Sequence, residues 1–303
     1  MDFGLTLPNF HYGAPPSREH ILAVARAAEE SGFTSAWASD HILVGSAYPR
    51  YGTLYEALST LAWVAAKTDY LKVGTSILVL PMRHALLAAK QIATIDDLSG
   101  GRVIVGLGAG WNKQEFELVG ANFSRRGRVL DESIRAMRTL WASDRPSFAG
   151  EFYRFDDTLF YPKPAQPGGP PIWIGGNSDA ALSRTATLGD AWHADEVPPD
   201  EFVVRVASLH QQATAAGRQV APTIRYTVDM NLAMGTRASD TVAETGAGAG
   251  VVDMKGSFDA MRAFVDRYRA IGATDFICQF EHRTAEQHID FIRAFSREII
   301  ARH

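Results

Sequence analysis

Residues 271–277, with the sequence IGATDFI, end a helical pattern at Gly272 and begin an apolar run directly after it. The same junction recurs at residues 188–192, with the sequence LGDAW, and at Gly32 before residues 33–37. Glycine readily adopts the left-handed conformation that ends many helices, so each junction predicts a helix followed by a strand. The repetition indicates a fold built from helix-to-strand units.

The rest of the chain continues this alternation. Apolar runs predict strands at residues 3–7, 33–37, 72–78, 103–107, 172–174, 191–193, 224–232 and 276–280. Helical patterns lie between them at residues 21–28, 54–66, 85–98, 129–141, 179–188, 202–216, 258–271 and 286–301. Strands separated by helices favour parallel pairing, and eight such units favour an α/β fold closed as a (β/α)8 TIM barrel. An open doubly wound sheet is the structural alternative.

Two segments stand outside the alternation. Residues 147–160, with Gly150 between short aromatic runs, predict a β-hairpin inserted into an otherwise single barrel domain spanning residues 1–303. Residues 239–256 are rich in Gly and Ala without clear periodicity. They are interpreted either as a mobile loop covering an active site or as a plain connection.

Composition limits the class of partner. The chain has 303 residues, is 46% hydrophobic, and carries 30 basic against 34 acidic side chains, a net charge of −4. It lacks the cationic field that gathers nucleic acid or anionic membrane, so a small-molecule substrate is expected. The single cysteine, Cys278, and the opening residues without a secretion signal favour a cytoplasmic location. No apolar run approaches the roughly 20 residues of a membrane span.

In parallel barrels chemistry gathers at the carboxyl ends of the strands. Ser39, Asp40 and His41 follow the second predicted strand, and an imidazole with an ordinary pKa of about 6.5 suits proton transfer near neutrality. We therefore take His41 as the candidate general acid or base, with Asp40 beside it. The alternative, in which Asp40 caps a turn and His41 fills a surface notch, is equally compatible with the spacing.

Alternate glycines follow the fourth predicted strand at Gly106, Gly108 and Gly110, directly before Trp111. Without Cβ atoms they let a flat ring or a backbone approach, although glycines also gather in tight strand-to-helix turns. Glu115 lies one helical turn beyond Trp111. We interpret it as a first-turn carboxylate favoured by the helix dipole in preference to a buried acid.

A bare backbone follows the fifth predicted strand, at Gly175, Gly176, Asn177 and Ser178, and leads into a helix. Free amides and the helix dipole can hold a phosphate at such a place. An ordinary helix start with Asn177 or Ser178 as the N-cap is the alternative.

These residues belong to a longer series of blocks, and together the blocks resemble the luciferase-like flavin and deazaflavin oxidoreductases. The blocks, in chain order, are residues 4–9, 27–33, 37–41, 71–78, 89–102, 108–111, 115–116, 126–128, 171–176 and 189–192. So many blocks in one order make a chance match improbable.

The resemblance implies a tricyclic ring in the barrel mouth beside a non-proline cis peptide, which here falls at Ser76-Ile77. It places the phosphate of the cofactor side chain on the segment from Gly175 to Ser178. The cofactor-binding residues it implies are Asn9, Asp40, Ser76, Ile77, Gly108, Gly110, Trp111, Glu115, Gly175, Gly176, Asn177 and Ser178.

Within this superfamily, residues 39–41, 110–111, 115–116 and 126–127 look like the branch assigned to coenzyme F420, with FMN as the chief rival cofactor. The implied reaction moves a hydride between the deazaflavin C5 and an unsaturated or carbonyl substrate, while His41 moves the proton and Asp40 orients His41. Sugar-phosphate dehydrogenases of the family carry an acid where this chain has Trp111, so their substrate is not assigned.

Three further expectations concern competing functions and assembly. A barrel metallohydrolase needs clustered histidines, but only His11 follows the first strand, and His84 and His193 are interpreted as structural, so no metal is expected. A flavin-binding or deazaflavin-binding protein without turnover is the non-catalytic alternative. The apolar helix at residues 54–66 favours a homodimer, although barrel packing explains it equally.

Overall fold

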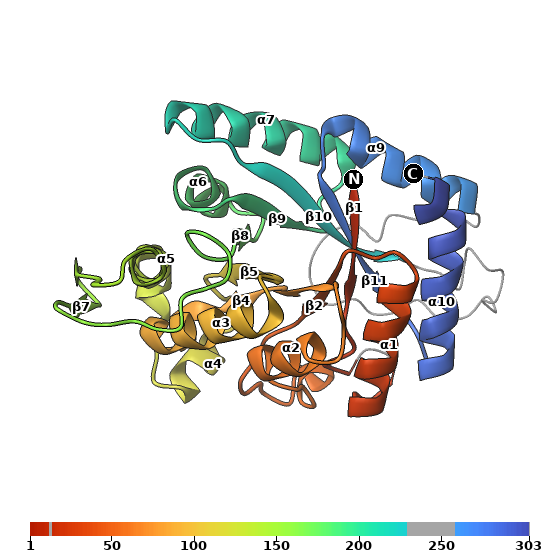
Figure 1. Ribbon diagram of the computed structural model, residues 1–303. Helices are drawn as coiled ribbons and strands as arrows, with labels where there is room; N and C mark the ends of the chain where they lie inside the picture. Colours follow the sequence, from red (N-terminus) through yellow and green to blue (C-terminus); the bar gives the residue numbers. More distant parts are fainter. Residues whose placement is uncertain (12–13, 229–257, 303) are drawn as a thin grey trace.

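The computed structural model describes residues 1–11, 14–228 and 258–302, which form a closed barrel of parallel strands surrounded by helices (Figure 1). The strands are β1 (Asp2–Thr6), β2 (Ser35–Ala38), β3 (Lys72–Thr75), β4 (Leu78–Val79), β5 (Val103–Gly108), β8 (Ile172–Gly175), β9 (Ala191–Asp195), β10 (Ala221–Val228) and β11 (Asp275–Phe280). Their order is β3-β2-β1-β11-β10-β9-β8-β5-β4, and a further β3–β5 pairing closes the ring. The predicted TIM barrel is confirmed, because β3 and β4 together occupy one of its eight strand positions.

The third predicted strand is divided into β3 and β4 at Ser76-Ile77, and both parts pair with β5. The peptide bond between Ser76 and Ile77 is cis, as the resemblance implied. Glycines on the neighbouring strands make room for this segment. A Cβ on Gly106 would lie 1.9 Å from the Thr75 carbonyl oxygen, and one on Gly108 would lie 2.0 Å from the Ile77 side chain.

Of the possibilities left open for the alternate glycines, this packing shows a close approach of the chain's own atoms. A Cβ on Gly175 would also meet Ile77, at 2.5 Å, and one on Gly110 would meet Val79 at 2.5 Å. The space beside these glycines is therefore occupied by the chain's own side chains. The close approach that glycine permits here is one of backbone to backbone and of backbone to Ile77.

The helices surround the barrel (Figure 1). They are α1 (Arg18–Glu30), α2 (Ala57–Ala65), α3 (Ala85–Ser99), α4 (Lys113–Leu118), α5 (Arg126–Ala142), α6 (Asp179–Leu188), α7 (Pro199–Ala215), α9 (Phe258–Ile271) and α10 (Ala285–Glu298). The helix α1 begins where Ser17 Oγ accepts the His20 amide, and Gly32, with φ +81°, follows its end. Both signals are of the kinds that begin and end helices.

Two short strands, β6 (Phe148–Ala149) and β7 (Arg154–Phe155), pair antiparallel within the range predicted for a hairpin. Figure 1 shows the pair outside the barrel, beside α5. The Glu132 carboxylate on α5 accepts the amides of Glu151, Phe152 and Tyr153, which anchors the turn. The loop predicted at residues 239–256, and the last residues of the strand predicted at 224–232, lie outside the described residues.

Large apolar side chains fill part of the barrel interior. Trp37, Ile104, Trp173, Ala191 and Ile277 form a buried cluster, in which the two indole rings lie 4.8 Å apart. A larger cluster lies between the strands and the helices. The interior is therefore a packed core beneath the carboxyl ends of the strands, as expected for this fold.

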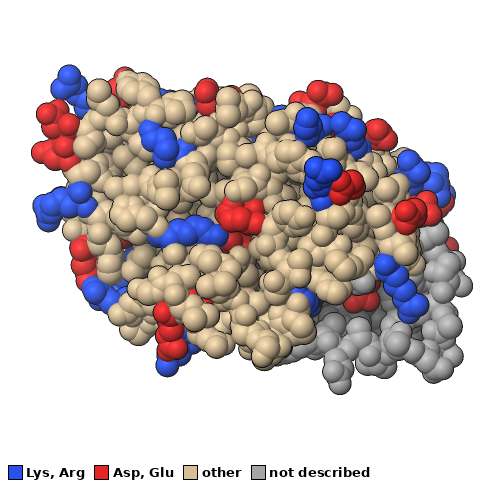
Figure 2. Space-filling model, turned by 90° about the horizontal axis from the view of Figure 1, so that it is seen from below, with Lys and Arg blue, Asp and Glu red and all other residues tan. Residues whose placement is uncertain are grey.

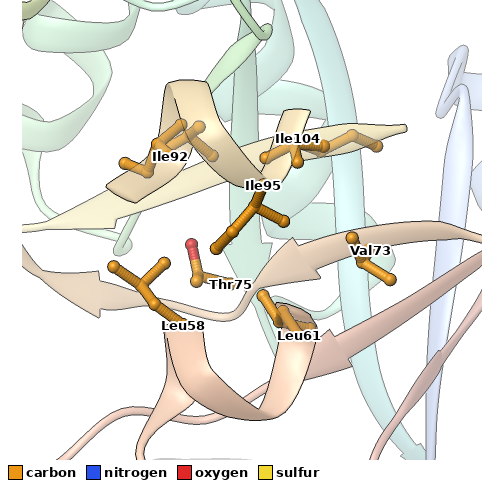
Figure 3. A pocket seen from close by; sticks show the side chains of 9 residues that line it. Leu58, Leu61, Val73, Thr75, Ile92, Ile95 and Ile104 are labelled. Carbon is orange, nitrogen blue, oxygen red and sulfur yellow. The ribbon is translucent and has the colours of Figure 1, made fainter. Parts of the chain in front are cut away.

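A small apolar pocket lies in the layer between the barrel and the helices α2 and α3 (Figure 3). Its lining includes Leu58, Leu61, Val73, Thr75, Ile92 and Ile95. Because most apolar side chains of α2 are buried in this layer of the same chain, barrel packing accounts for them. The homodimer expected from this helix stays a prediction.

The molecular surface carries charges of both signs. On the face seen in Figure 2, basic side chains stand singly or beside acidic ones, with broad uncharged areas between them. In the part of the chain that the structure describes, no helix combines the length and the apolar character that a membrane crossing requires.

Candidate active site

The central pair of the site joins His41, which follows β2, to Glu115 on α4. His41 Nδ1 lies 2.8 Å from Glu115 Oε2, and the two side chains are 9% and 2% exposed. The amides of Ile42 and Leu43 also donate to Glu115 Oε1, at 2.5 and 3.3 Å. A buried carboxylate therefore holds both the imidazole and the backbone that follows it.

This geometry corrects the interpretation of Glu115 as a first-turn carboxylate that serves the helix dipole. Asn112 is the N-cap of α4, and its side chain accepts the Glu115 amide, so the Glu115 carboxylate is left to bind His41. Burial opposes ionisation of Glu115, but the hydrogen bonds from His41, Ile42 and Leu43 outweigh it and lower the pKa of Glu115 below its usual value. Glu115 is therefore ionised at neutral pH.

The prediction that Asp40 orients His41 is wrong. The carboxylate of Asp40 is fully buried and accepts two hydrogen bonds from Arg83, at 2.7 and 2.5 Å, and one from the Val79 amide, at 2.9 Å. It points toward β4 and away from the His41–Glu115 pair. The sequence neighbours Asp40 and His41 therefore serve different partners.

Asn9, in the segment that follows β1, supports the same backbone. Its amide nitrogen donates to the carbonyl groups of Ser39 and Tyr55, at 2.8 and 3.0 Å, and its oxygen accepts the Ser39 amide at 3.0 Å. The side chain is completely buried. Asn9, expected as a cofactor contact, therefore acts on the site by fixing the backbone that precedes His41.

Aromatic side chains surround His41. The Tyr51 ring lies 4.3 Å from the imidazole at an angle of 40°, and Trp111 meets His41 edge-on at 5.9 Å. Tyr48 in turn meets Trp111 edge-on at 5.0 Å, and Trp111 remains 53% exposed. Tyr48 and Tyr51 were not predicted as site residues, because only their position in the loop after β2 indicated such a role.

The segment that begins α6 is an ordinary helix start, and phosphate binding there stays a prediction. Ser178 is the N-cap, since its hydroxyl accepts the Ala181 amide. The Asn177 side chain exchanges two hydrogen bonds with the Asp195 backbone, at 2.7 and 3.1 Å. Gly176 has φ +110°, and a Cβ there would approach nothing closer than 3.6 Å. The first amide groups of a helix have no hydrogen-bond partner within the helix, so a phosphate bound here would accept hydrogen bonds from backbone N–H groups.

His193 lies in the barrel interior and contacts the residue at the strand break. Its Nε2 is 2.8 Å from the Ser76 hydroxyl, and its ring stacks on Trp37 at 5.2 Å. Burial, with a smaller effect of Arg225, lowers the pKa of His193 to about 3. The sequence interpretation of His193 as a structural residue agrees with this environment, and its neutral ring orients the Ser76 hydroxyl.

The neutral state of His193 predicts how stability depends on pH. In the unfolded chain this histidine gains a proton near its ordinary pKa of 6.5, whereas in the folded chain it does so only near 3. The free energy of unfolding should therefore decrease as the pH falls below 6.5, by about 2 kcal/mol from this residue alone at about pH 5. Urea unfolding at neutral and at acid pH measures the effect, and His193→Gln should weaken the pH dependence. An equal dependence in that variant would contradict the assignment.

The residues at this end of the barrel suit a ring with a phosphate tail. Among the described residues, Thr6 Oγ1 and Asn112 Nδ2 are buried polar atoms that find no hydrogen-bond partner. Buried polar atoms of proteins rarely stay unpaired, which favours a polar ligand at this end. The open backbone at Gly176 and the exposed indole of Trp111 fit a phosphate and a flat ring.

Comparison with known proteins shows the family to which this chain belongs. The family model described as luciferase-like monooxygenase matches residues 1–295. The chain is 36% identical over 202 residues to an FMNH(2)-dependent dimethylsulfone monooxygenase of Pseudomonas putida, a match covering 65% of this chain and 54% of the relative. It is 32% identical over 229 residues to the protein of the same name from Pseudomonas fluorescens (strain Pf0-1), covering 71% and 61%. The chain thus spans little more than half the length of these relatives.

Solved structures share the fold at lower identity. The monooxygenase RslO1 from Streptomyces bottropensis superposes with a TM-score of 0.82 at 21% identity, covering 100% of this chain and 99% of that one. An F420-dependent secondary alcohol dehydrogenase in complex with an F420-acetone adduct gives 0.81 at 20% identity with the same coverage. With the family match extending over residues 1–295, this chain belongs to the luciferase-like monooxygenase family.

Proposed function

We propose that this chain is an F420-dependent oxidoreductase that moves a hydride between the deazaflavin C5 and a small organic substrate. The observation that carries the proposal is the buried His41–Glu115 pair at the carboxyl ends of the strands. Such a pair can give a proton to the oxygen of a carbonyl that receives a hydride, or take the proton of an alcohol that loses one. When bound, the deazaflavin ring supplies the hydride chemistry.

The hydrogen bond to Glu115 sets the proton positions on His41. Because Glu115 is ionised, it accepts the Nδ1–H of His41, which leaves Nε2 as the nitrogen that takes or gives a proton at the substrate oxygen. Tyr51 packs against the ring, and together with Glu115 it restricts how the imidazole turns. His41 is thus the proposed catalytic residue, and Glu115 is the proposed positioning residue.

Other residues are proposed to hold the cofactor. Trp111 offers an exposed aromatic face beside His41, and Ser76 and Ile77 form the strand break beneath the barrel mouth. The backbone at Gly176, Asn177 and Ser178 offers amides and the dipole of the ten-residue helix α6 to a phosphate. For Gly108, Gly110 and Gly175 we propose only backbone contacts, because side chains occupy the space where their Cβ atoms would lie.

A second function is a monooxygenase that uses reduced FMN. It is favoured by the relatives at 32% and 36% identity, whose names state FMNH(2) dependence. The ring and phosphate positions proposed above serve either cofactor. The two functions differ in the co-substrate, because a monooxygenase consumes dioxygen whereas hydride transfer from F420 does not.

Titration of the purified chain with F420 and with FMN, each followed by ring fluorescence, separates the two. We expect saturable binding of F420 and much weaker binding of FMN. Trp111→Ala should weaken binding roughly tenfold through loss of aromatic contact, whereas Leu118→Ala, an exposed position on the same loop-and-helix segment, should not. If the chain binds FMN but not F420, and takes up dioxygen when the bound FMN is reduced, the monooxygenase replaces the F420-dependent oxidoreductase as the proposed function.

A further inference from the structure

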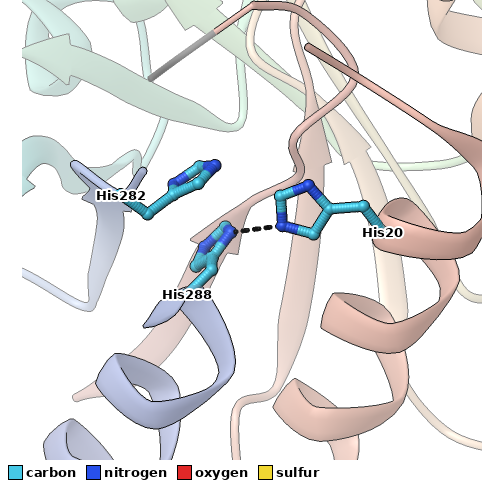
Figure 4. Close-up of side chains that lie close together, drawn as sticks. All are labelled: His20, His282 and His288. Atoms are coloured by element: carbon cyan, nitrogen blue, oxygen red, sulfur yellow. Dashed lines mark hydrogen bonds between the residues drawn. The ribbon is translucent and has the colours of Figure 1, made fainter. Parts of the chain in front are cut away.

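Three histidines from the two ends of the chain meet in the interior. His20 lies in the first turn of α1, His282 follows β11, and His288 lies in the first turn of α10. Figure 4 shows the three rings directed toward one another. They are 5%, 3% and 1% exposed, and one ring nitrogen of each lies within 4.8 Å of the others. None of them takes part in the His41–Glu115 site.

The hydrogen bonds of the cluster show which ring nitrogens face one another. His282 Nδ1 lies 2.9 Å from the Phe280 carbonyl oxygen, so it carries the proton and the lone pair is on Nε2. A carbonyl that binds the second ring nitrogen is the usual support of a metal-ligating histidine. His288 Nδ1 lies 3.2 Å from His20 Nε2, and one of these two nitrogens carries the proton between them. For both nitrogens to bind one ion, that proton must move to the other nitrogen of its own ring. Among the described residues, the buried Nε2 of His288 has no hydrogen-bond partner.

The surroundings keep all three rings neutral. Burial lowers the pKa of His282 to about 4, and it lowers the pKa values of His20 and His288 as well. Glu286, in the first turn of α10, acts against this effect at His20 and supplies negative charge beside the cluster. Neutral imidazole is the form that binds metal, so protons compete weakly at neutral pH.

We propose that His20, His282 and His288 bind one late first-row transition metal ion, Zn²⁺ in the first place, through three imidazole nitrogens. Two nitrogen ligands of a tetrahedral zinc ion, each at 2.0–2.1 Å from it, lie about 3.3 Å apart. The separation between His20 Nε2 and His288 Nδ1 is 3.2 Å. The widest separation in the cluster exceeds the ideal by up to about 1.5 Å. The His282 ring stacks on His288, with centroids 4.0 Å apart and planes at 16°, so His282 must turn for its Nε2 to face the ion.

The site would join the first and last helices of the barrel. The helices α1 and α10 pack side by side (Figure 1), and His20 and His288 are 268 residues apart in sequence. A metal held between them links the two ends of the folded chain and is absent from the unfolded one, so it stabilises the fold by linkage. This inference does not depend on which redox cofactor the enzyme uses.

The experiment uses the full chain without a histidine tag, freed of metal by a chelator and dialysed. We expect one equivalent of Co²⁺ to bind with the visible absorption of a tetrahedral nitrogen site, and one equivalent of Zn²⁺ to displace it. Zn²⁺ should raise Tm by several degrees. His288→Ala should weaken binding at least tenfold, while His210→Ala, an exposed position on α7, should bind as the parent does.

Two further outcomes decide the matter. If His288→Ala folds poorly, His20→Gln preserves side-chain volume and should show the same loss, with folding monitored by circular dichroism. A parent chain that binds no stoichiometric metal overturns the proposal, and the three rings are then only a neutral hydrogen-bonded cluster. Stoichiometric binding that survives both substitutions also overturns it, because the metal then lies elsewhere.

Discussion

Replacing His41 by Asn is expected to lower kcat by roughly 10²-fold or more while leaving the affinity for the cofactor nearly unchanged. His41 Nδ1 is committed to Glu115, so the catalytic proton moves at Nε2, and asparagine offers no titratable atom there. Steady-state kinetics with the cofactor identified by titration give kcat, and the same titration gives affinity. The effect on kcat should exceed the effect on KM, because proton transfer is required in the transition state.

Two variants define what the His41 result means. Glu115→Gln retains the shape of the partner but removes its charge, so kcat should decrease and its pH dependence should shift. His210→Asn makes the same change at an exposed position on α7 and should have no effect. Unchanged turnover in His41→Asn would remove His41 from the mechanism. A loss of cofactor binding equal to the loss of turnover would reassign it to binding.

Replacing Asp40 by Ala is expected to lower the free energy of unfolding by about 3 to 5 kcal/mol. The change leaves the Arg83 guanidinium, whose side chain is 14% exposed, without its bidentate partner, and it leaves the Val79 amide without an acceptor. Glu56, 3.6 Å from Arg83, compensates part of the positive charge of Arg83, so we expect the loss of stability to lie near the lower end of this range. Urea unfolding measures the loss.

A matched change on the surface provides the control for Asp40. Asp259 on α9 pairs with Arg262, but its side chain is 85% exposed. Exposed pairs contribute about 0 to 1 kcal/mol, so Asp259→Ala should be nearly neutral. Equal effects of the two substitutions would contradict the buried role of Asp40. If Asp40→Ala instead lowers kcat strongly without lowering stability, Asp40 takes part in the reaction, as the sequence analysis predicted when it had Asp40 orient His41.

The fold followed from local signals because each unit of this barrel repeats the same chemistry. Gly32, Gly189 and Gly272 each stand at the end of a helix and shortly before an apolar strand, so local sequence indicates the order of elements. Gly32 and Gly272 have the expected left-handed backbone, with φ +81° and +104°, whereas Gly189 is extended, with φ −88°. The division of the third strand at Ser76-Ile77 was expected only through resemblance. Periodicity treats residues 72–78 as one strand, whereas the break is visible only in how Gly106 and Gly108 pack against it.

The candidate site was harder to predict, because its contacts join residues distant in sequence. The position of His41 after a strand was sufficient to find it, but Glu115, its partner, is 74 residues away. Asp40 was paired with His41 by adjacency, but in the structure Asp40 binds Arg83 and Val79 whereas His41 binds Glu115. The cluster of His20, His282 and His288 has no local signature, since its members approach one another only when the barrel closes.

Diffraction from crystals grown with F420 tests the central claim most directly. The account predicts electron density for the tricyclic ring at the carboxyl ends of the strands, with His41 Nε2 facing the ring and the phosphate of the cofactor side chain on the amides of residues 176–178. Density for the ring elsewhere, or a ring at the barrel mouth with His41 turned away from it, would contradict the account.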